Sequence, residues 1–238
     1  MSSKVKVAII GTNGVPSNYG GFETLVEHLV EELAERYDLT VFCSKKNSDR
    51  ILNEYKGAKL EYINLNANNS ESIPYDIISI FRACKRFDKI LILGSSGCIV
   101  LPFLLHYKKK FIFNFGGLDW KRSKWGFFTK KFLKLSESLG IRFSEILISD
   151  NIGIQEYIIE SYNRDSYLIS YGGDHAKAVK IKEDDIKKYP FLEYEYAFSV
   201  ARIQPDNNIE MILSAFVNAI SKIFVLVGNW NKSEYGIR

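Results

Sequence analysis

The feature that most constrains the fold of this chain is a regular alternation of short apolar segments with amphipathic ones. The apolar segments are rich in β-branched residues, as buried strands are, and the others repeat their apolar residues at helical spacing. The predicted strands are residues 5–10, 39–43, 60–63, 89–94, 110–115, 145–149 and 166–170. The predicted helices are residues 22–33, 75–86, 98–107, 125–139 and 152–162. This order predicts an α/β fold, a Rossmann-like parallel sheet with helices on both faces.

The pattern divides the chain after residue 174. Residues 175–190 are polar and charged, which is typical of a linker. A strand at 196–200, a helix at 209–220 and a strand at 223–228 then begin a second Rossmann-like domain. One strand–helix–strand unit cannot cover both faces of a parallel sheet. We therefore expect an N-terminal domain at 1–174, a linker at 175–190 and, at 191–238, the truncated start of a C-terminal domain.

Composition excludes several classes of protein. The chain is 46% hydrophobic and 25% charged, which is ordinary for a globular protein. Its net charge of +4 is low for a dedicated nucleic-acid binder. The three cysteines match no zinc motif and lie among apolar residues, which predicts reduced, buried thiols in a cytosolic protein. Residues 90–105 carry no charge, but glycines and Pro102 interrupt them, so we expect a strand, a turn and a buried helix rather than a membrane span.

Glycine-rich loops follow the predicted strands that end at residues 10, 93, 115 and 170. Parallel α/β sheets bind ligands at this carboxyl edge. Gly20 and Gly21 directly precede a helix, whose free N–H groups and positive dipole end suit a diphosphate; a plain tight turn is the alternative. The loop lacks the dinucleotide-binding spacing, the second strand ends without an acid for a ribose, and no P-loop motif is present.

Positive charge gathers between residues 106 and 135, where nine Lys or Arg residues face a single acid, Asp119. Trp120, Trp125 and three phenylalanines lie among these cations. Basic and aromatic residues together predict an interfacial membrane contact. Single-stranded nucleic acid would favour the same mixture, and a solvated helix whose aromatic residues face the core is the simpler alternative.

Individual polar residues are weaker candidates. Asp119 could touch a sugar hydroxyl, or it could serve only as an ion-pair partner for Lys121 or Arg122. Arg202 follows a predicted strand, where an arginine can neutralise a leaving diphosphate. His28 is expected to be solvated, and the role of His175 stays open.

Several motifs resemble those of retaining GT-B glycosyltransferases, and most closely a rhamnosyltransferase-like branch that builds bacterial surface polysaccharides. They run in the family's order across the whole chain. They are GTNGVP at 11–16, YGGFET at 19–24, GLDWKR at 117–122, KWG at 124–126, SDNIGI at 149–154, YGGD at 171–174, ARIQPDNN at 201–208 and VGNW at 227–230.

The resemblance implies two Rossmann-like domains, the first binding a lipid-linked or other glycan acceptor and the second a dTDP- or UDP-linked sugar. It implies no cofactor and no metal, because backbone amides and cations neutralise the diphosphate. In this scheme Gly20, Gly21 and Arg202 bind the donor diphosphate, and Asp119 and Arg202 are catalytic. The residues that contact the acceptor or the membrane are Trp120, Lys121, Arg122, Lys124 and Trp125. The protein would act in the cytoplasm, peripherally at the inner face of the membrane.

Three departures from the family pattern accompany the resemblance. Residues 206–208 carry no lysine where many relatives have one, and Gly116 stands where the branch has an acid. Such enzymes also continue well past Arg238, with a paired-glutamate motif that grips the donor, so the chain alone is expected to be inactive. Two other hypotheses stay open: a non-catalytic membrane-docking or acceptor-binding module, and, more weakly, a nucleotide-dependent oxidoreductase.

Overall fold

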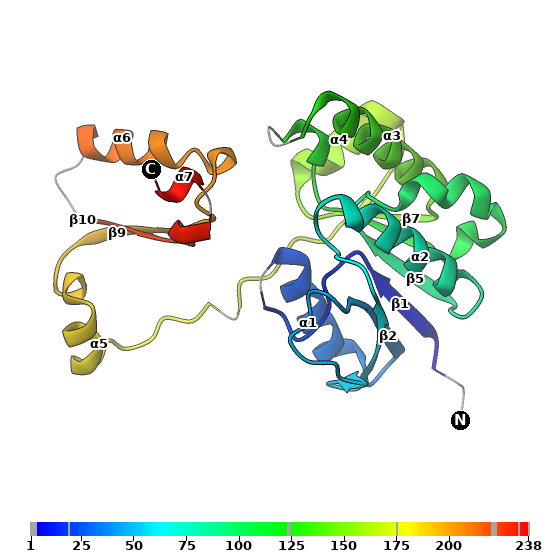
Figure 1. The fold of residues 1–238 in the computed structure, drawn as a ribbon, viewed down its shortest axis with the longest axis horizontal. Coiled ribbons are helices and arrows are strands. Elements are labelled where there is room, and N and C mark those ends of the chain that lie inside the picture. The colour runs from blue at the N-terminus through cyan, green and yellow to red at the C-terminus, as the bar shows by residue number, and fades with distance from the viewer. Residues whose placement is uncertain are drawn as a thin grey trace. The chain divides into compact units, whose positions relative to one another are not determined.

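The computed structural model describes residues 4–18, 20–122, 125–174, 176–219, 223–232 and 234–237. The chain separates into two compact units, Met1–Gly172 and Gly173–Arg238, and each is described here by itself (Figure 1).

The first unit is built on an eight-stranded sheet in the order β3-β4-β2-β1-β5-β6-β7-β8. The strands are β1 (Lys6–Ile10), β2 (Asp38–Ser44), β3 (Glu54–Tyr55), β4 (Ala58–Ile63), β5 (Lys89–Leu93), β6 (Phe111–Phe115), β7 (Ile146–Ser149) and β8 (Tyr167–Leu168). Every neighbouring pair is parallel except β3 and β4. The carboxyl ends of β1, β5, β6 and β7 therefore lie along one edge.

Helical segments connect these strands. The α-helices are α1 (Gly21–Leu33), α2 (Ser72–Cys84), α3 (Phe127–Phe143) and α4 (Ile152–Tyr162), and the 3₁₀ segments are η1 (Asn69–Glu71), η2 (Cys98–Lys110) and η3 (Asp119–Lys121).

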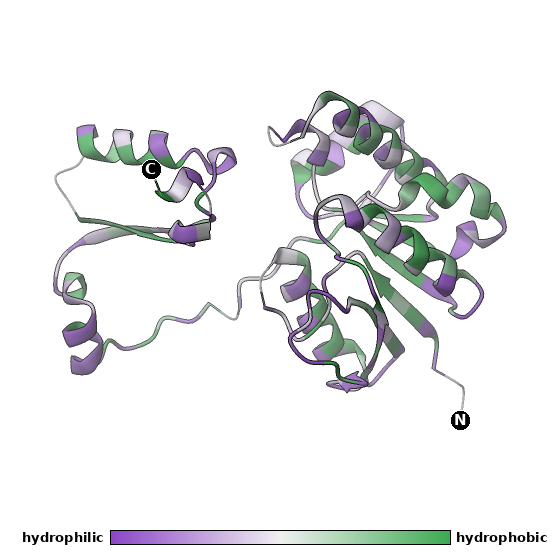
Figure 2. Cartoon of the chain, viewed as in Figure 1, coloured by the Kyte–Doolittle hydropathy of each residue, from purple (hydrophilic) through white to green (hydrophobic). Residues whose placement is uncertain are grey.

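Successive strand residues send their side chains to opposite faces of the sheet. Ala8 and Ile10 of β1 join one buried cluster, which α2, η2, α3 and α4 cover, whereas Ile9 joins a second cluster that α1 covers. The hydropathy colouring shows the sheet and the inner sides of these helices as largely hydrophobic (Figure 2). Helices therefore lie on both faces, and the predicted α/β class is confirmed.

The second unit contains α5 (Glu183–Lys188), η4 (Pro190–Glu193), β9 (Tyr196–Val200), η5 (Pro205–Asn207), α6 (Ile209–Ala219), β10 (Ile223–Val227), η6 (Trp230–Lys232) and α7 (Glu234–Ile237). Strands β9 and β10 pair in parallel, and α6 packs on them by stacking Phe216 on Phe224 at 4.6 Å. On the other face of β9, Phe198 and Val200 remain 66% and 70% exposed. The unit thus has the strand–helix–strand core of a Rossmann-like fold, and Phe191 of η4 packs on Tyr196 at 5.1 Å on this second, largely exposed face.

The structure differs from the expected elements at several places. The segment at 98–107 is a 3₁₀ helix broken at Leu104, two residues after Pro102. Strand β8 keeps only two of the five expected residues, and β3 was not predicted. The side chain of Asn151 caps α4 by accepting a hydrogen bond from the amide of Ile154. The expected linker contains the short helix α5.

Two further expectations concern membrane spanning and the thiols. Within the part of the chain that the structure describes, no helix is long and apolar enough to cross a bilayer. Cys43, Cys84 and Cys98 are all free and buried, as predicted. Burial raises the pKa of Cys43 and of Cys84 to about 11, so these thiols stay protonated at neutral pH.

Candidate functional site

Three glycine loops meet at the carboxyl edge of the sheet, around the side chain of Phe22. Phe22 lies in the first turn of α1, and its ring packs against the backbone of Gly116, after β6, and of Gly94, after β5. A Cβ at Gly116 would lie only 2.4 Å from Cζ of this ring, and one at Gly94 would lie 3.5 Å from Cε2. The loops that follow β1, β5 and β6 are thus joined at the edge where such sheets bind ligands.

Gly20 and Gly21 stand at the start of α1 in different conformations. Gly20 has φ 140 and ψ 152, a region that is essentially limited to glycine, and a Cβ there would lie 1.8 Å from a carboxylate oxygen of Glu23. Among the residues that the structure describes, a Cβ on Gly21 would meet nothing within 4 Å. Beside Gly21, the N-terminus of α1 is therefore open to a ligand that approaches the backbone closely, as a phosphate does.

Glu23 was not predicted as part of the site, because the helical pattern places it on the polar side of α1. The structure buries it, with 8% exposed, and folds its carboxylate back onto the first loop. Oε1 accepts hydrogen bonds from the backbone amide of Asn13 at 2.9 Å and from its Nδ2 at 2.8 Å. The signal in the sequence was an acid at the third position of the helix, where a carboxylate interacts favourably with free N–H groups.

Tyr75 and Asp76 of α2 also reach this edge and were missed. The hydroxyl of Tyr75 lies 2.9 Å from the carbonyl of Thr12 and 2.8 Å from that of Phe42, so it ties the first loop to β2. Asp76 accepts a hydrogen bond from the hydroxyl of Ser96 in the loop after β5. Burial raises the pKa of Asp76 to about 7, so this carboxyl is partly protonated at neutral pH.

The basic segment after β6 divides into anchored and exposed parts. Asp119 and Arg122 pair at 3.6 Å, which agrees with the ion-pair alternative for Asp119. The ammonium nitrogen of Lys134 lies 4.7 Å from the ring centroid of Trp120. Trp120, Lys121 and Arg122 lie in or directly after η3, and Trp125 lies two residues before α3. The predicted contact residue Lys124 lies outside the described residues.

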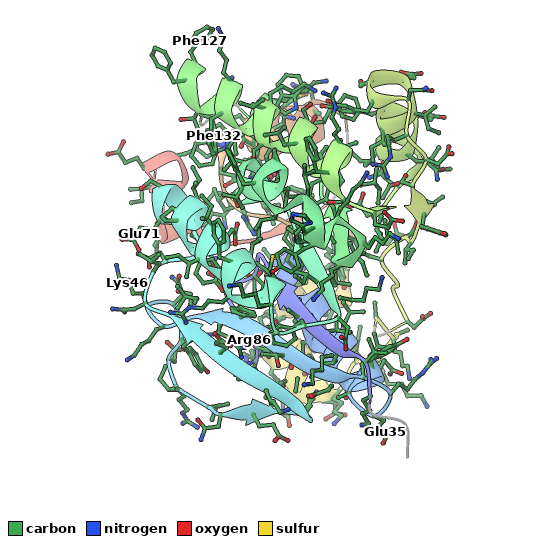
Figure 3. All side chains as sticks on the ribbon, turned by 90° about the vertical axis from the view of Figure 1, so that its right-hand side faces the viewer. Glu35, Lys46, Glu71, Arg86, Phe127 and Phe132 are labelled. Carbon is green, nitrogen blue, oxygen red and sulfur yellow. The ribbon has the colours of Figure 1, made fainter. Side chains whose placement is uncertain are left out.

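The start of α3 presents aromatic side chains to solvent. Phe127 is 65% exposed and Phe128 is 84% exposed. Figure 3 shows Phe127 at the free end of α3, pointing away from the body of the unit. The ammonium group of Lys131 lies 4.4 Å from the Phe127 ring centroid. The alternative in which all these aromatic residues face the core does not hold for Phe127 and Phe128.

Arg202 belongs to the second unit and is exposed directly after β9. Its position is set by the backbone, because the amide of Ala201 donates to the carbonyl of Val227 at 3.0 Å and Nδ2 of Asn207 donates to the carbonyl of Arg202 at 2.7 Å. His28 is exposed next to Glu31, as expected, and His175 lies outside the residues that the structure covers.

Comparisons with known proteins add the family and the fold. The structure of UGT89C1 from Arabidopsis thaliana in complex with UDP-L-rhamnose matches 99% of this chain and 69% of its own length, with a TM-score of 0.51 at 15% identity. The complex of UGT89C1 with quercetin matches 97% of this chain and 70% of its own, with a TM-score of 0.52 at 13% identity. At this identity the likeness establishes the shared GT-B type of fold.

A search of curated proteins found no match. A protein family described as a domain of unknown function, DUF1972, matches residues 4–174, which include all the glycine loops of the site. The chain therefore belongs to the DUF1972 family.

Proposed function

We propose that this chain takes part in sugar transfer from a nucleotide sugar to an acceptor hydroxyl. The observation that carries the proposal is the open N-terminus of α1 at Gly21, placed where the loops after β1, β5 and β6 meet. A diphosphate fits such a position, because the helix supplies free N–H groups and a positive dipole end. The shared fold supports the proposal, since a protein of that fold is complexed with UDP-L-rhamnose.

In the proposed reaction, the bond between the anomeric carbon and the diphosphate oxygen breaks and the acceptor hydroxyl oxygen bonds to that carbon. Backbone amides at Gly20 and Gly21 stabilise the negative charge on the departing diphosphate. The same stabilising role is proposed separately for the guanidinium group of Arg202. Asp119 guides the acceptor hydroxyl, whose proton passes to an oxygen of the departing diphosphate as the new bond forms. We further propose a dTDP- or UDP-linked donor, with rhamnose as the sugar, and retention of configuration, in the synthesis of a cell-surface polysaccharide on a lipid-linked glycan.

Nucleotide binding can be measured by thermal shift with UDP, dTDP, GDP and NAD. We expect one nucleoside diphosphate to raise the midpoint by several degrees, because saturation at one hundred times Kd stabilises the folded state by about 2.7 kcal/mol. Gly21→Ala should abolish most of this shift without lowering the midpoint of the free protein, since its methyl group enters the space assigned to the diphosphate. Gly126 also stands at a helix start, and a Cβ there would meet no described residue within 4 Å. Gly126→Ala should therefore respond as the natural protein does.

The outcomes of this measurement separate the hypotheses. A shift with NAD alone would favour the oxidoreductase alternative and overturn the proposal. A full nucleotide response in Gly21→Ala would remove Gly21 from the diphosphate site.

We also propose a peripheral contact with the anionic inner face of the membrane, through the exposed start of α3. The residues proposed to make this contact are Phe127, Phe128, Lys130 and Lys131, because exposed aromatic and basic residues on one helix suit an anionic interface.

Co-sedimentation with phosphatidylserine vesicles at low salt tests this contact. Replacing both phenylalanines with serine should weaken vesicle binding by at least about tenfold. Phe103→Ser, which removes a side chain that is 82% exposed on η2, is the matched control. Equal binding of the double variant and the control would refute this contact, and vesicle binding without any nucleotide response would favour the docking-module alternative.

A further inference from the structure

Two motifs have received no role so far, residues 149–154 and 171–174. The pairing of strands β6, β7 and β8 brings the two motifs to the same edge of the sheet. Asn114 pairs with Ile148 across β6 and β7, and Ser149 pairs with Leu168 across β7 and β8. Beyond β8, the amide of Ile169 still donates to the carbonyl of Ser149 at 2.9 Å. Asn114, Asp150 and Tyr171 therefore leave three adjacent strands at their carboxyl ends.

Asn114 is the polar group at this place that lacks a partner. It is 6% exposed, and its Oδ1 is buried without a hydrogen-bond partner among the described residues. Buried carboxamide oxygens are nearly always paired, because leaving one unpaired costs its full desolvation. Asn114 also follows three strand residues that are apolar, so its presence at the strand end is not explained by packing of the core.

Tyr171 connects Asn114 and Asp150, because its phenol is affected by both side chains. A hydrogen bond from Asn114 reaches the phenol of Tyr171 and lowers its pKa, although burial and the nearby charge of Asp150 raise that pKa overall. Nδ2 of Asn151 donates to Oδ1 of Asp150 at 2.7 Å, which orients this carboxylate. The ring of Tyr171 is 49% exposed, so a ligand reaches the cluster from the side of this ring.

The chemistry of the three groups points to one class of ligand. A carboxamide oxygen and a carboxylate both accept hydrogen bonds from hydroxyl groups. A half-exposed tyrosine ring offers a flat apolar surface for the C–H face of a sugar. The carboxylate of Asp150 disfavours a phosphate, and no cluster of metal ligands is found in the part of the chain that the structure describes.

We propose that Asn114, Asp150 and Tyr171 form a subsite for a neutral sugar ring, in which hydroxyl groups donate to Oδ1 of Asn114 and to the Asp150 carboxylate while the ring stacks on Tyr171. The subsite deepens the proposed function, on which it rests, by assigning the position of a sugar separately from that of the diphosphate.

Saturation-transfer NMR on the whole chain tests the subsite with a panel of methyl glycosides that includes methyl α-L-rhamnopyranoside, and with UDP and UDP-sugars. We expect at least one methyl glycoside, or the sugar part of one UDP-sugar, to receive saturation. Tyr171→Ala and Asp150→Ala should weaken this binding at least tenfold. Tyr167→Ala, which removes a ring that is 66% exposed on the neighbouring β8, should leave it unchanged. Asn114→Asp retains an acceptor oxygen in nearly the same shape, and its thermal midpoint reports whether the site still folds.

Each outcome has one meaning. Binding of a free glycoside identifies an acceptor-type sugar, and an effect of Tyr171→Ala on a UDP-sugar but not on UDP identifies the donor sugar. Sugar binding without any nucleotide response would leave the subsite standing and refute the proposed transfer reaction. A nucleotide response with no sugar bound, or with Tyr171→Ala binding sugar as the natural protein does, would overturn the subsite.

Discussion

Replacing Glu137 with alanine is expected to lower the free energy of unfolding by about 3 kcal/mol. Glu137 is 1% exposed in the middle of α3, and its Oε1 accepts hydrogen bonds from the hydroxyls of Tyr157 and Tyr162 at 2.6 Å each and from Nζ of Lys134 at 2.9 Å. Alanine would leave these three donors without their common acceptor. Urea denaturation of the natural and variant chains measures the difference.

The controls for this prediction use smaller changes. Glu137→Gln keeps one acceptor oxygen but turns the other into a donor, so it should lose about half as much stability as alanine. Glu145 is an exposed glutamate close to Glu137 in the sequence, just before β7. Glu145→Ala should therefore leave the free energy of unfolding almost unchanged. Equal stability of Glu137→Ala and Glu145→Ala would contradict the assigned role of Glu137.

The same cluster predicts how stability depends on pH. Burial and the hydrogen bond to Glu137 raise the pKa of Tyr162 above 10.0. Burial lowers the pKa of Lys134, but its hydrogen bonds to Tyr157 and Glu137 outweigh this and raise that pKa above 10.5. The folded state holds both protons more tightly than the unfolded chain, so this stabilisation is complete below about pH 10 and is lost above it. The loss should be smaller in Glu137→Ala.

Replacing Arg202 with alanine should lower the rate of sugar transfer by about 100-fold or more. The reason is that the guanidinium group is assigned to the charge that builds on the leaving diphosphate, where removing one stabilising donor costs about 3 kcal/mol in the barrier. The fold should change little, because the Arg202 side chain is exposed. Release of nucleoside diphosphate from a nucleotide sugar, with and without an acceptor, measures the rate in the longest expressible form of the protein.

Arg202→Lys keeps the positive charge but not the two-pronged geometry of the guanidinium group, so it should fall between alanine and the natural protein. If Arg202→Ala turned over as fast as the natural protein, at an unchanged thermal midpoint, Arg202 would not stabilise the leaving diphosphate.

Much of the fold could be predicted because the strongest elements carry local signals. The expected bounds of α4 and β9 agree with the structure, since each is a continuous apolar or periodic segment between clear turn residues. Segment 98–107 was harder, because its apolar residues do not show that Pro102 and Leu104 interrupt a regular helix. Strand β8 was overestimated for a similar reason, as β-branched and aromatic residues at 166–170 continue past the residues that pair with β7.

The alternation of strands and helices, the parallel class of the sheet and the glycine loops at its carboxyl edge could all be predicted from local patterns, because these features depend on residues close to one another in the chain. Which polar side chains far apart in the sequence come into contact depends on the tertiary structure. Glu137 finds its tyrosines 20 and 25 positions away, and Tyr75 reaches the carbonyl of Thr12 across 63. The packing of helices on the sheet determines which of these distant residues come into contact. The local sequence pattern around a buried carboxylate or carboxamide is the same as that around an exposed one. The positions of Glu23, Glu137 and Asn114 therefore became visible only in the folded chain.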